Sequence, residues 1–254
     1  MSVPTRAALI LIGEELLSGK IDDANGVHTI RTLRKIGVDL REIRMIGDEI
    51  DHIGDVVRDA ASRYDVVFTS GGIGPTHDDL TMRGIAGGFG LTMETHEGML
   101  QIIRERFGAQ DATLEIWERM AQLPAGCEVV LSEGTRVPIF RLRNVWILPG
   151  VPELFRLQFD QIARELQGIP TKLRTIYVNV GEGELAPHLD AVVAAHPHAT
   201  LGSYPVLHAD DHRTRLTVES RDEAILNAAF NALRQRLPSE WIVRVGDQLR
   251  IGEH

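Results

Sequence analysis

Short apolar or alternating runs are interleaved with longer amphipathic stretches from residue 7 to about residue 168. The short runs are typical of strands, which are predicted at 7–12, 38–46, 65–69, 137–142 and 144–148. The longer stretches repeat an apolar residue every three or four positions and predict helices at 24–36, 50–62, 79–88, 96–108, 113–121 and 152–166. The expected buried stripe of the first helix consists of Val27, Ile30, Leu33 and Ile36.

This alternation of strands and helices predicts an α/β fold, a three-layer doubly wound sheet that is mostly parallel, with helices on both faces. In such sheets, ligands bind beyond the carboxyl ends of the strands. The stretches "LIGEELLSG" (11–19) and "TSGGIGPTHDD" (69–79) both lie at the ends of predicted strands. The sequence therefore places two unusual loops at the edge where folds of this class bind their ligands.

A second pattern begins after "GIPTK" (168–172), an expected linker in which a Gly and a Pro interrupt the helical periodicity. Strands are predicted at 175–180, 199–205, 215–220 and 241–245, and helices at 184–195 and 222–236. The order βαββαβ predicts a small α+β domain of the ferredoxin-like plait type. The expected domains are residues 1–170 and 171–254.

The composition is that of an ordinary globular protein, with 43% hydrophobic and 25% charged residues among 254. A formal net charge of −9 argues against nucleic acid or an anionic membrane as a partner. An anionic ligand must then be held by backbone donors, a few basic side chains or a metal ion. The single cysteine, Cys127, is expected to be a packed thiol, and without an apolar segment of membrane-spanning length the chain is expected to be cytoplasmic.

The glycine-rich loop 69–79 matches neither of the common phosphate-binding patterns. A Walker A loop needs Lys followed by Ser or Thr after its last glycine, where this chain has Pro75-Thr76. The dinucleotide fingerprint needs glycines at alternate positions, whereas Gly71 and Gly72 are adjacent. Both interpretations are therefore set aside.

Physical reasoning still favours an anion site in this loop. Glycines let backbone N–H groups approach a ligand, and hydroxyl groups add donors; these residues are Ser70, Gly71, Gly72, Gly74 and Thr76. Asp78 or Asp79 is expected to cap the helix that begins near Leu80. Two adjacent carboxylates would repel a bare phosphate unless a divalent cation bridges them. The alternative is a tight strand–helix connection whose aspartates serve only as caps.

Two further loops follow predicted strands. In "GEELLSGKIDDAN" (13–25), Glu14 and Glu15 either start a helical turn or hold a metal, and Asn25 is expected to cap the next helix. In "ILPGVPELF" (147–155), Gly150 permits a close approach and Pro152 suits a first helical turn. A single metal cluster would combine the acids of two loops, Glu14, Glu15, Asp78 and Asp79.

With these loops in place, the sequence resembles the competence/damage-inducible protein A (CinA) family, whose N-terminal domain belongs to the molybdopterin-binding (MoaB/MogA-like) superfamily. The matching stretches are "LIGEELLSGKIDDAN", "IGDEIDHI", "TSGGIGPTHDDLT", "LPAG" and "ILPGVPELF". "NVGEGELAPHLD" and "TLGSYP" match the small plait domain of the family. The deamidase domain that usually follows in this family is not expected here, because the sequence stops at His254.

The resemblance implies a divalent-metal-dependent pyrophosphatase that uses Mg²⁺, Mn²⁺ or Co²⁺ and acts on ADP-ribose or a related dinucleotide such as FAD. Asp79 and Asp78 would be catalytic, and the metal would be held by Asp79, Asp78, Glu14 and Glu15. The implied phosphate- and substrate-binding residues are Gly13, Ser18, Asn25, Ser70, Gly71, Gly72, Gly74, Pro75, Thr76, Gly134, Thr135, Pro149, Gly150 and Pro152. The alternatives are a protein that binds a pterin or nucleotide without turnover, and a pterin adenylyltransferase.

One stretch departs from the family pattern. Relatives commonly have Asn-Pro-x-Gly-Thr-Ala-Pro-Gly-Phe where this chain reads "SEGTRVPIF" (132–140), so Gly134 and Thr135 remain but Ile139 replaces the second glycine. If this turn lines the pocket, a changed substrate preference or weaker activity is expected. The family also implies a homo-oligomer.

Overall fold

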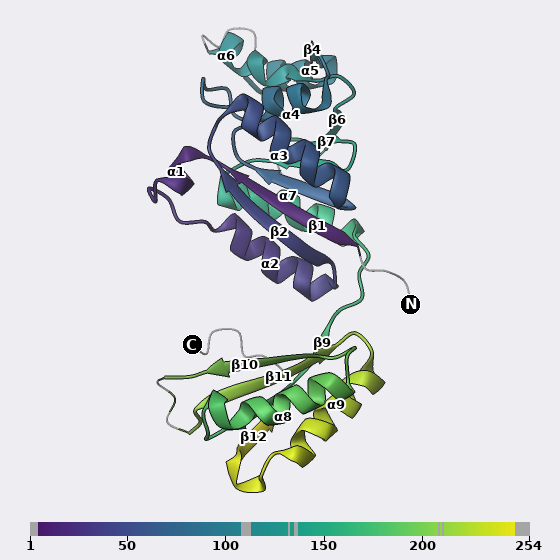
Figure 1. The fold of residues 1–254 in the computed structure, drawn as a ribbon. Coiled ribbons are helices and arrows are strands. Elements are labelled where there is room, and N and C mark those ends of the chain that lie inside the picture. The colour runs from purple at the N-terminus through teal and green to yellow at the C-terminus, as the bar shows by residue number, and fades with distance from the viewer. Residues whose placement is uncertain are drawn as a thin grey trace. The chain divides into compact units, whose positions relative to one another are not determined.

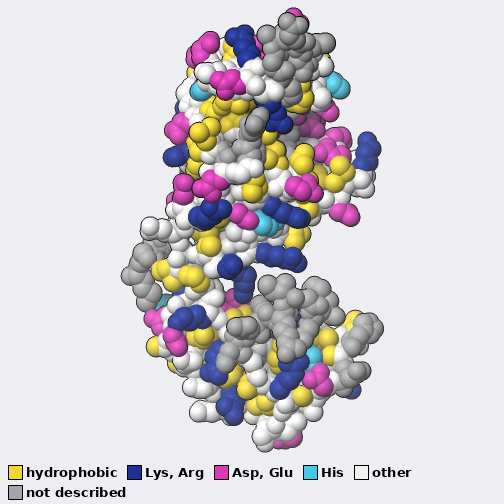
Figure 2. All heavy atoms as spheres, turned by 180° about the vertical axis from the view of Figure 1, so that it is seen from behind, with side chains coloured by type: hydrophobic (Ala, Val, Ile, Leu, Met, Phe, Trp, Pro, Cys, Tyr) yellow, Lys and Arg dark blue, Asp and Glu magenta, His cyan; other side chains and the backbone are white. Residues whose placement is uncertain are grey.

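The chain forms two compact units, Met1–Gly168 and Ile169–His254 (Figure 1). This computed structural model describes residues 5–107, 113–131, 133–134, 137–207, 209 and 211–246. No helix within these ranges is long and apolar enough to cross a membrane. Acidic and basic side chains are interspersed over the face of the first unit in Figure 2, so this face presents no continuous basic surface.

The first unit contains a six-stranded sheet. In spatial order its strands are β2 (Asp39–Ile46), β1 (Arg6–Ile12), β3 (Val66–Ser70), β8 (Val145–Leu148), β7 (Ile139–Leu142) and β6 (Glu128–Val130). The first four strands are parallel, and β7 and β6 are antiparallel additions at one side. A separate pair is formed by β4 (Met93–Thr95) and β5 (Gln122–Pro124). The predicted, mostly parallel sheet is confirmed.

Helices cover both faces of this sheet. The helical segments are α1 (Glu14–Leu17), α2 (Asn25–Ile36), α3 (Ile50–Arg63), α4 (Thr81–Phe89), α5 (Glu97–Phe107), α6 (Leu114–Glu118), η1 (Arg119–Ala121) and α7 (Pro152–Glu165). Alternate residues of β1 enter two cores, with Leu9 packing on the α2 and α7 side and Ile10 on the α3 side. The three-layer architecture is thus a direct result of an apolar strand that is buried on both faces.

The buried face of α2 differs from the prediction. Leu33 is buried, but Val27 and Ile30 are exposed, and the helix instead turns Gly26 and Thr29 inward. The buried Thr29 hydroxyl donates a hydrogen bond to the carbonyl oxygen of Asn25 at 2.9 Å. The regular three-residue spacing of apolar residues therefore pointed to the wrong side of this helix.

Helices α3 and α4 approach each other closely because glycines occupy their contact. A β-carbon on Gly54 would lie 2.6 Å from the carbonyl oxygen of Gly84, and one on Gly88 would lie 2.3 Å from that of Gly54. Both distances are too short for any other residue type. Since α4 follows the 71–80 loop, this contact fixes the helix on which the loop ends.

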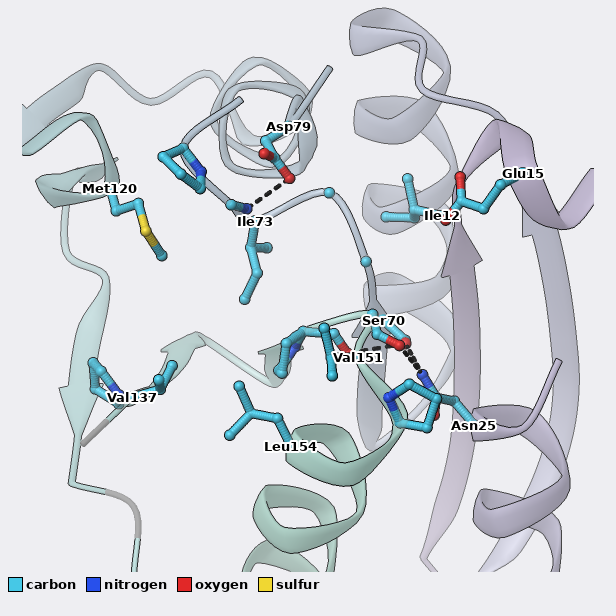
Figure 3. Close-up of a pocket in the computed structure, with 18 of the residues that line it drawn as sticks. Ile12, Glu15, Asn25, Ser70, Ile73, Asp79, Met120, Val137, Val151 and Leu154 are labelled. Atoms are coloured by element: carbon cyan, nitrogen blue, oxygen red, sulfur yellow. Dashed lines mark hydrogen bonds between the residues drawn. The ribbon is translucent and has the colours of Figure 1, made fainter. Parts of the chain in front are cut away.

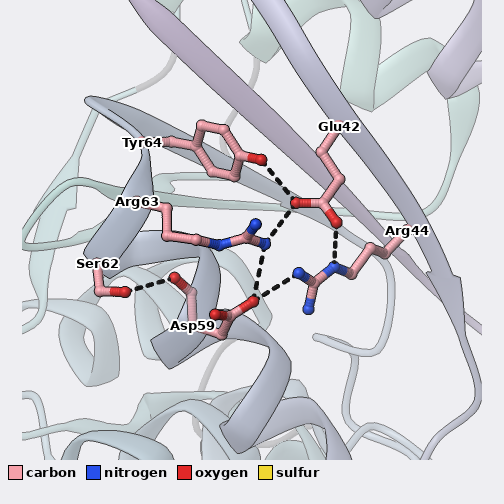
Figure 4. Close-up of polar contacts among 6 residues, drawn as sticks. All are labelled: Glu42, Arg44, Asp59, Ser62, Arg63 and Tyr64. Carbon is pink, nitrogen blue, oxygen red and sulfur yellow. Dashed lines mark hydrogen bonds and ion pairs between the residues drawn. The ribbon is translucent and has the colours of Figure 1, made fainter.

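A network of charged side chains joins β2 to α3 (Figure 4). Arg44 contacts Glu42 at 2.6 Å and Asp59 at 2.5 Å, and Arg63 bonds the same two acids at 2.7 and 2.8 Å. Tyr64 donates its hydroxyl to Glu42 at 2.8 Å. The bond from Arg44 is the main cause that lowers the pKa of the Glu42 carboxyl.

The second unit has the predicted βαββαβ order. Its elements are β9 (Lys172–Val178), α8 (Glu182–Ala195), β10 (Thr200–Pro205), β11 (Thr214–Ser220), α9 (Glu223–Arg236), η2 (Ser239–Trp241) and β12 (Ile242–Gly246). The strands form an antiparallel sheet in the order β10-β11-β9-β12, and the helices pack against it through Leu185 and Phe230. Asp222 caps α9 by accepting the N–H groups of Ala224 and Ile225 at 2.8 and 3.1 Å.

Candidate functional site

A cavity of about 630 Å³ opens beyond the carboxyl ends of β1, β3 and β8 (Figure 3). Its volume is in the range of small-molecule binding sites. The loops 13–25, 71–80 and 149–152 all contribute to its wall, so the edge of the sheet identified from the sequence is where the pocket lies. Helices α5 and α6 close it on another side.

The glycine loop passes close to the end of β1. Gly71 has a φ of +108°, and a β-carbon there would lie 2.1 Å from the carbonyl oxygen of Ile12. Gly72 also has a positive φ, of +64°. Over the described chain, no hydrogen bond occupies the amide N–H groups of Gly72 and Ile73, and both residues line the cavity. These two N–H groups are the donors that the loop offers to a ligand.

Asp79 has a different role from the expected helix cap. Its carboxylate accepts the N–H of Gly74 at 2.6 Å, and from Thr76 the N–H at 2.8 Å and the hydroxyl at 2.5 Å. The prediction that Asp78 or Asp79 caps α4 is wrong, because Leu80 holds the cap position without a side-chain bond. Asp79 thus closes the 74–79 turn on itself and occupies two amides that were expected to face a phosphate.

Thr81, in the first turn of α4, anchors the other half of the loop. Its hydroxyl donates to the carbonyl oxygen of Gly71 at 2.8 Å, and its N–H donates to that of Gly72 at 3.0 Å. The Thr81 side chain is fully buried. Thr81 was not predicted as a site residue, although a hydroxyl at the start of the predicted helix was a usable signal.

Asn25 connects two of the pocket loops. Its side-chain amide donates to the Ser70 hydroxyl at 2.9 Å and to the carbonyl oxygen of Gly150 at 2.8 Å (Figure 3). Ser70 in turn donates to the carbonyl oxygen of Pro149 at 3.3 Å. The predicted cap role of Asn25 is wrong, because Asn25 is the first residue of α2 and Asp23 accepts the Gly26 N–H instead.

The acids of the two loops 13–25 and 69–79 do not form the predicted cluster. Within the described ranges, no three His, Cys, Asp or Glu side chains lie close enough together to bind one metal ion. Glu15 and Asp79 line the cavity, whereas the carboxylate of Glu14 lies beside Gly47. Asp78 is exposed and shares the single Thr76 hydroxyl proton with Asp79, at 2.6 Å, and this contact lowers the pKa of Asp78.

Asp48 is a further acid near the site that was not among the predicted site residues. Its carboxylate accepts the Glu14 N–H at 2.9 Å. It also experiences electrostatic repulsion from the carboxylates of Glu15, Asp78 and Asp79. Burial raises the pKa of Asp48, the bond from Glu14 opposes this, and the three neighbouring acids raise it further. Its place after the strand β2, in "IGDEIDHI", was the available signal.

Replacing Asp48 by Asn is expected to stabilise the protein at neutral pH. Because the folded-state pKa of this carboxyl is raised, its contribution to stability is complete below the ordinary aspartate pKa of about 4 and is lost as the pH rises through the folded-state value. An asparagine keeps the acceptor for Glu14 and does not ionise. Thermal unfolding of both proteins in metal-free buffer should give a higher Tm for Asp48→Asn at neutral pH and no such gain near pH 4. A lower Tm at neutral pH would contradict this account.

Much of the remaining pocket wall is apolar. It is formed by Met99, Ile102, Ile103, Trp117 and Met120 from α5, α6 and η1, and by Leu154 from α7. The turn containing Val137 and Pro138 also lines it, and buried Gln158 holds this turn by donating to their carbonyl oxygens at 2.9 and 3.3 Å. These helices were predictable from their apolar periodicity. Their position at the pocket was not, since an apolar stripe has the same pattern whether it packs on a core or lines a pocket.

The other predicted site residues are distributed as follows. Pro75, Pro149 and Pro152 line the cavity, and Pro152 begins α7 as expected. Of the described residues proposed for the site, those outside the lining are Gly13, Glu14, Ser18, Thr76, Asp78 and Gly134. Ser18 instead donates its hydroxyl to the carbonyl oxygen of Glu14 at 2.8 Å. Thr135 falls outside the described ranges. Cys127 is a buried thiol, and burial raises its pKa to about 11.

Comparison with known families accounts for both units. Residues 8–168 match the family described as a probable molybdopterin binding domain, and residues 170–246 match the middle domain of FAD synthase. The chain belongs to the molybdopterin-binding domain family. Residues 170–246, whose sequence resembles the small plait domain of the CinA family, are thus also similar to a part of FAD synthase.

Similar proteins include one named for FAD synthesis and one named for its likeness to CinA. A probable FAD synthase of Caenorhabditis elegans is 31% identical over 91% of this chain and 50% of its own length. A CinA-like protein of Myxococcus xanthus is 29% identical over 90% of this chain and 57% of its own. This chain therefore spans about half the length of these relatives. The crystal structure of CinA from Thermoplasma acidophilum aligns with a TM-score of 0.58 at 29% identity, covering 64% of this chain and 98% of that one.

Proposed function

We propose that the first unit binds a nucleotide through its diphosphate and hydrolyses the diphosphate bond with the help of a divalent cation. FAD and ADP-ribose are the proposed substrates. One observation carries this proposal: a single cavity combines hydrogen-bond donors with an apolar wall. The donors are the N–H groups of Gly72 and Ile73, which bond to no other described residue. The names of the relatives support a ligand of the FAD type.

In the proposed complex, the amides of Gly72 and Ile73 donate to one phosphate group. Donors that are fixed before the ligand arrives stabilise negative charge as it develops, without a further cost of reorganisation. Asp79 and Thr81 fix these donors by holding the two halves of the loop. A planar ring would lie against Trp117 and Met120, since aromatic and thioether side chains pack well on flat apolar surfaces.

A divalent cation fits this site only as a complex with the nucleotide. The crowding of Glu15, Asp78 and Asp79 around Asp48 supplies negative charge and oxygen ligands, but the described side chains form no complete cage. Mg²⁺ commonly binds through one or two carboxylates together with substrate phosphates. Glu15 and Asp48 would be those carboxylates, because three hydrogen bonds already engage Asp79. When bound, the cation would polarise a phosphoryl oxygen and activate water.

A second candidate function is binding of a nucleotide or pterin without turnover. The observation that favours it is the engagement of Asp79 in the loop, which leaves the proposed catalytic carboxylate without an obvious role in activating water. The same cavity and donors would hold the ligand in either case.

The two candidates are separated by incubating the full chain with FAD, ADP-ribose, NAD or CoA, each with Mg²⁺, Mn²⁺ or Co²⁺, and measuring the nucleoside monophosphate released. We expect AMP from FAD and ADP-ribose only when a cation is present. Ligand binding by calorimetry without release of AMP would support the binding protein. Neither binding nor release, with any of these compounds, would contradict both candidates.

A further inference from the structure

The helices α5, α6 and η1 are joined to the rest of the first unit through the strand pair β4–β5. In this antiparallel pair Thr95 lies opposite Gln122, and its hydroxyl accepts the Gln122 side-chain amide at 2.7 Å. The pairing continues to the start of the helices, because the His96 N–H donates to the carbonyl oxygen of Ala121 at 2.8 Å. The chain therefore enters and leaves this helical segment side by side, and α5 and α6 lie together at one end of the unit in Figure 1.

The contacts of this segment differ between its interior and its base. An ion pair joins two of the helices, with Arg104 of α5 donating to Glu118 of α6 at 2.8 Å. Toward the sheet, Met99 and Ile103 pack in the same apolar cluster as Ile73. Apolar contacts have no fixed direction, so the segment can shift over this cluster without breaking a directed bond. A helical segment that rests on apolar contacts and is attached by two strands has the construction of a lid.

The same segment carries the one basic side chain among the described residues of the cavity wall. This residue is Arg106, which shares a face of α5 with Met99, Ile102 and Ile103, since these positions recur every three or four residues. The other charged residues of the described wall are the acids Glu15, Asp22, Asp23 and Asp79. Among the described residues of the wall, an anionic ligand thus meets a positively charged side chain only on the α5 side.

A basic residue in the last turn of a helix is also favourable without a ligand, because it complements the helix dipole. Arg104 and Arg106 both lie in the last turn of α5. Arg104 is turned toward Glu118, whereas Arg106 lines the cavity. The dipole therefore accounts for the basic residues at this end of α5, but it does not account for the direction of Arg106.

We propose that α5, α6 and η1 form a lid that closes over a bound nucleotide, and that Arg106 then binds the phosphate that Gly72 and Ile73 do not hold. This role of Arg106 rests on the nucleotide site proposed above. A guanidinium group donates two parallel hydrogen bonds to one phosphate, and this pair gains strength where water is excluded. The same movement would bring Trp117 and Met120 onto the ring, so closure would hold both ends of the nucleotide.

The role of Arg106 is tested with one nucleotide that has two phosphates and one that has a single phosphate. The probes are α,β-methylene-ADP, whose bridging carbon prevents hydrolysis, and AMP, each titrated by calorimetry into the full chain with Mg²⁺. Arg106→Gln should weaken binding of α,β-methylene-ADP about tenfold or more, as expected for the loss of a charge-assisted pair, and should change AMP binding by about twofold at most. Arg106→Lys should recover part of the loss, because the charge remains but the fork of donors does not.

Arg119→Gln is the matched control, because it removes a positive charge from η1 at a residue outside the cavity wall, and it should bind both probes as the wild type does. Equal weakening of both probes by Arg106→Gln, or no weakening of either, would overturn the role of Arg106 and leave the nucleotide site intact. A wild-type chain that binds neither probe would overturn the site, and the role of Arg106 with it.

Closure of the lid is tested by amide hydrogen exchange of the full chain with and without saturating ligand. In the free protein, the amides of α5 and α6 should exchange faster than those of α3, which packs tightly against α4. Saturating α,β-methylene-ADP should slow exchange in α5 and α6 about tenfold or more. AMP should have a much smaller effect, because it offers Arg106 no second phosphate. Exchange in α5 and α6 that α,β-methylene-ADP leaves unchanged would overturn the lid.

Discussion

Replacing Asp79 by Asn is expected to reduce nucleotide turnover by about a hundredfold or more, because the loop that presents the phosphate donors loses its internal anchor. The carboxylate accepts from Gly74 through one oxygen and from Thr76 through the other. An asparagine amide has one accepting oxygen, so its NH₂ group would face either the Gly74 N–H or the Thr76 donors. These donors are half-buried or exposed, so the lost hydrogen bond costs about 0.5–1.5 kcal/mol, enough to loosen the turn while the unit stays folded.

The neighbouring acid is the matched control for this prediction. Asp78 is more exposed, and its described side-chain partners are the Thr76 hydroxyl and, at 3.8 Å, His77, so Asp78→Asn should change turnover by a few-fold at most. Turnover and ligand affinity should be measured for both variants, with circular dichroism to verify folding. If Asp79→Asn matches the wild type in turnover and affinity, Asp79 has no part in the site. If only affinity is lost, because no turnover exists, the anchor role stands for a binding protein.

Gly71→Ala should produce the largest loss of stability of any single methyl addition in the loop. The new β-carbon would meet the backbone oxygen of Ile12, which cannot move without displacing β1, and the φ of +108° is itself unfavourable for alanine. Overpacking and backbone strain together should cost about 3 kcal/mol or more, which lowers the Tm of the first unit by about 10 °C. Ligand binding should be lost as well, because the amides of Gly72 and Ile73 move with the chain.

A glycine in an open position provides the comparison. Gly87 lies within α4, and a β-carbon there would have no neighbour within 4 Å. Gly87→Ala should therefore stabilise the protein by about 0.5–1 kcal/mol, by the ordinary helix preference for alanine. Thermal unfolding of both variants tests this contrast. An unchanged Tm for Gly71→Ala would mean that the close approach to β1 is not a constraint on the fold.

The fold was predictable because strands buried on both faces leave an unambiguous signal. The apolar run that became β1 and the five buried residues of β3 are examples. The orientation of α2 was not predictable from Val27 and Ile30, since periodicity shows that a helix has an apolar face but not what covers it.

The location of the site could be predicted from the sequence, but most of its hydrogen bonds could not. The glycines and prolines marked the loops, because these residues are required wherever the chain turns tightly. Sequence alone could not show whether the carboxylate of Asp79 faces a ligand or its own backbone, because both arrangements need the same residue. Asp48 and Thr81 were missed for a related reason, since each acts through a partner distant in sequence, the N–H of Glu14 and the carbonyl oxygen of Gly71.

The glycine contact between α3 and α4 has a consequence for how binding can change during evolution. Gly54, Gly84 and Gly88 form a seam where the two helices meet backbone to backbone, leaving no slack for a larger side chain. A bulkier residue at this seam would tilt α4, and Thr81 at its first turn would carry Gly71 and Gly72 with it. Nucleotide affinity thus depends on positions that do not contact the nucleotide, and substitutions at these glycines can change it during evolution.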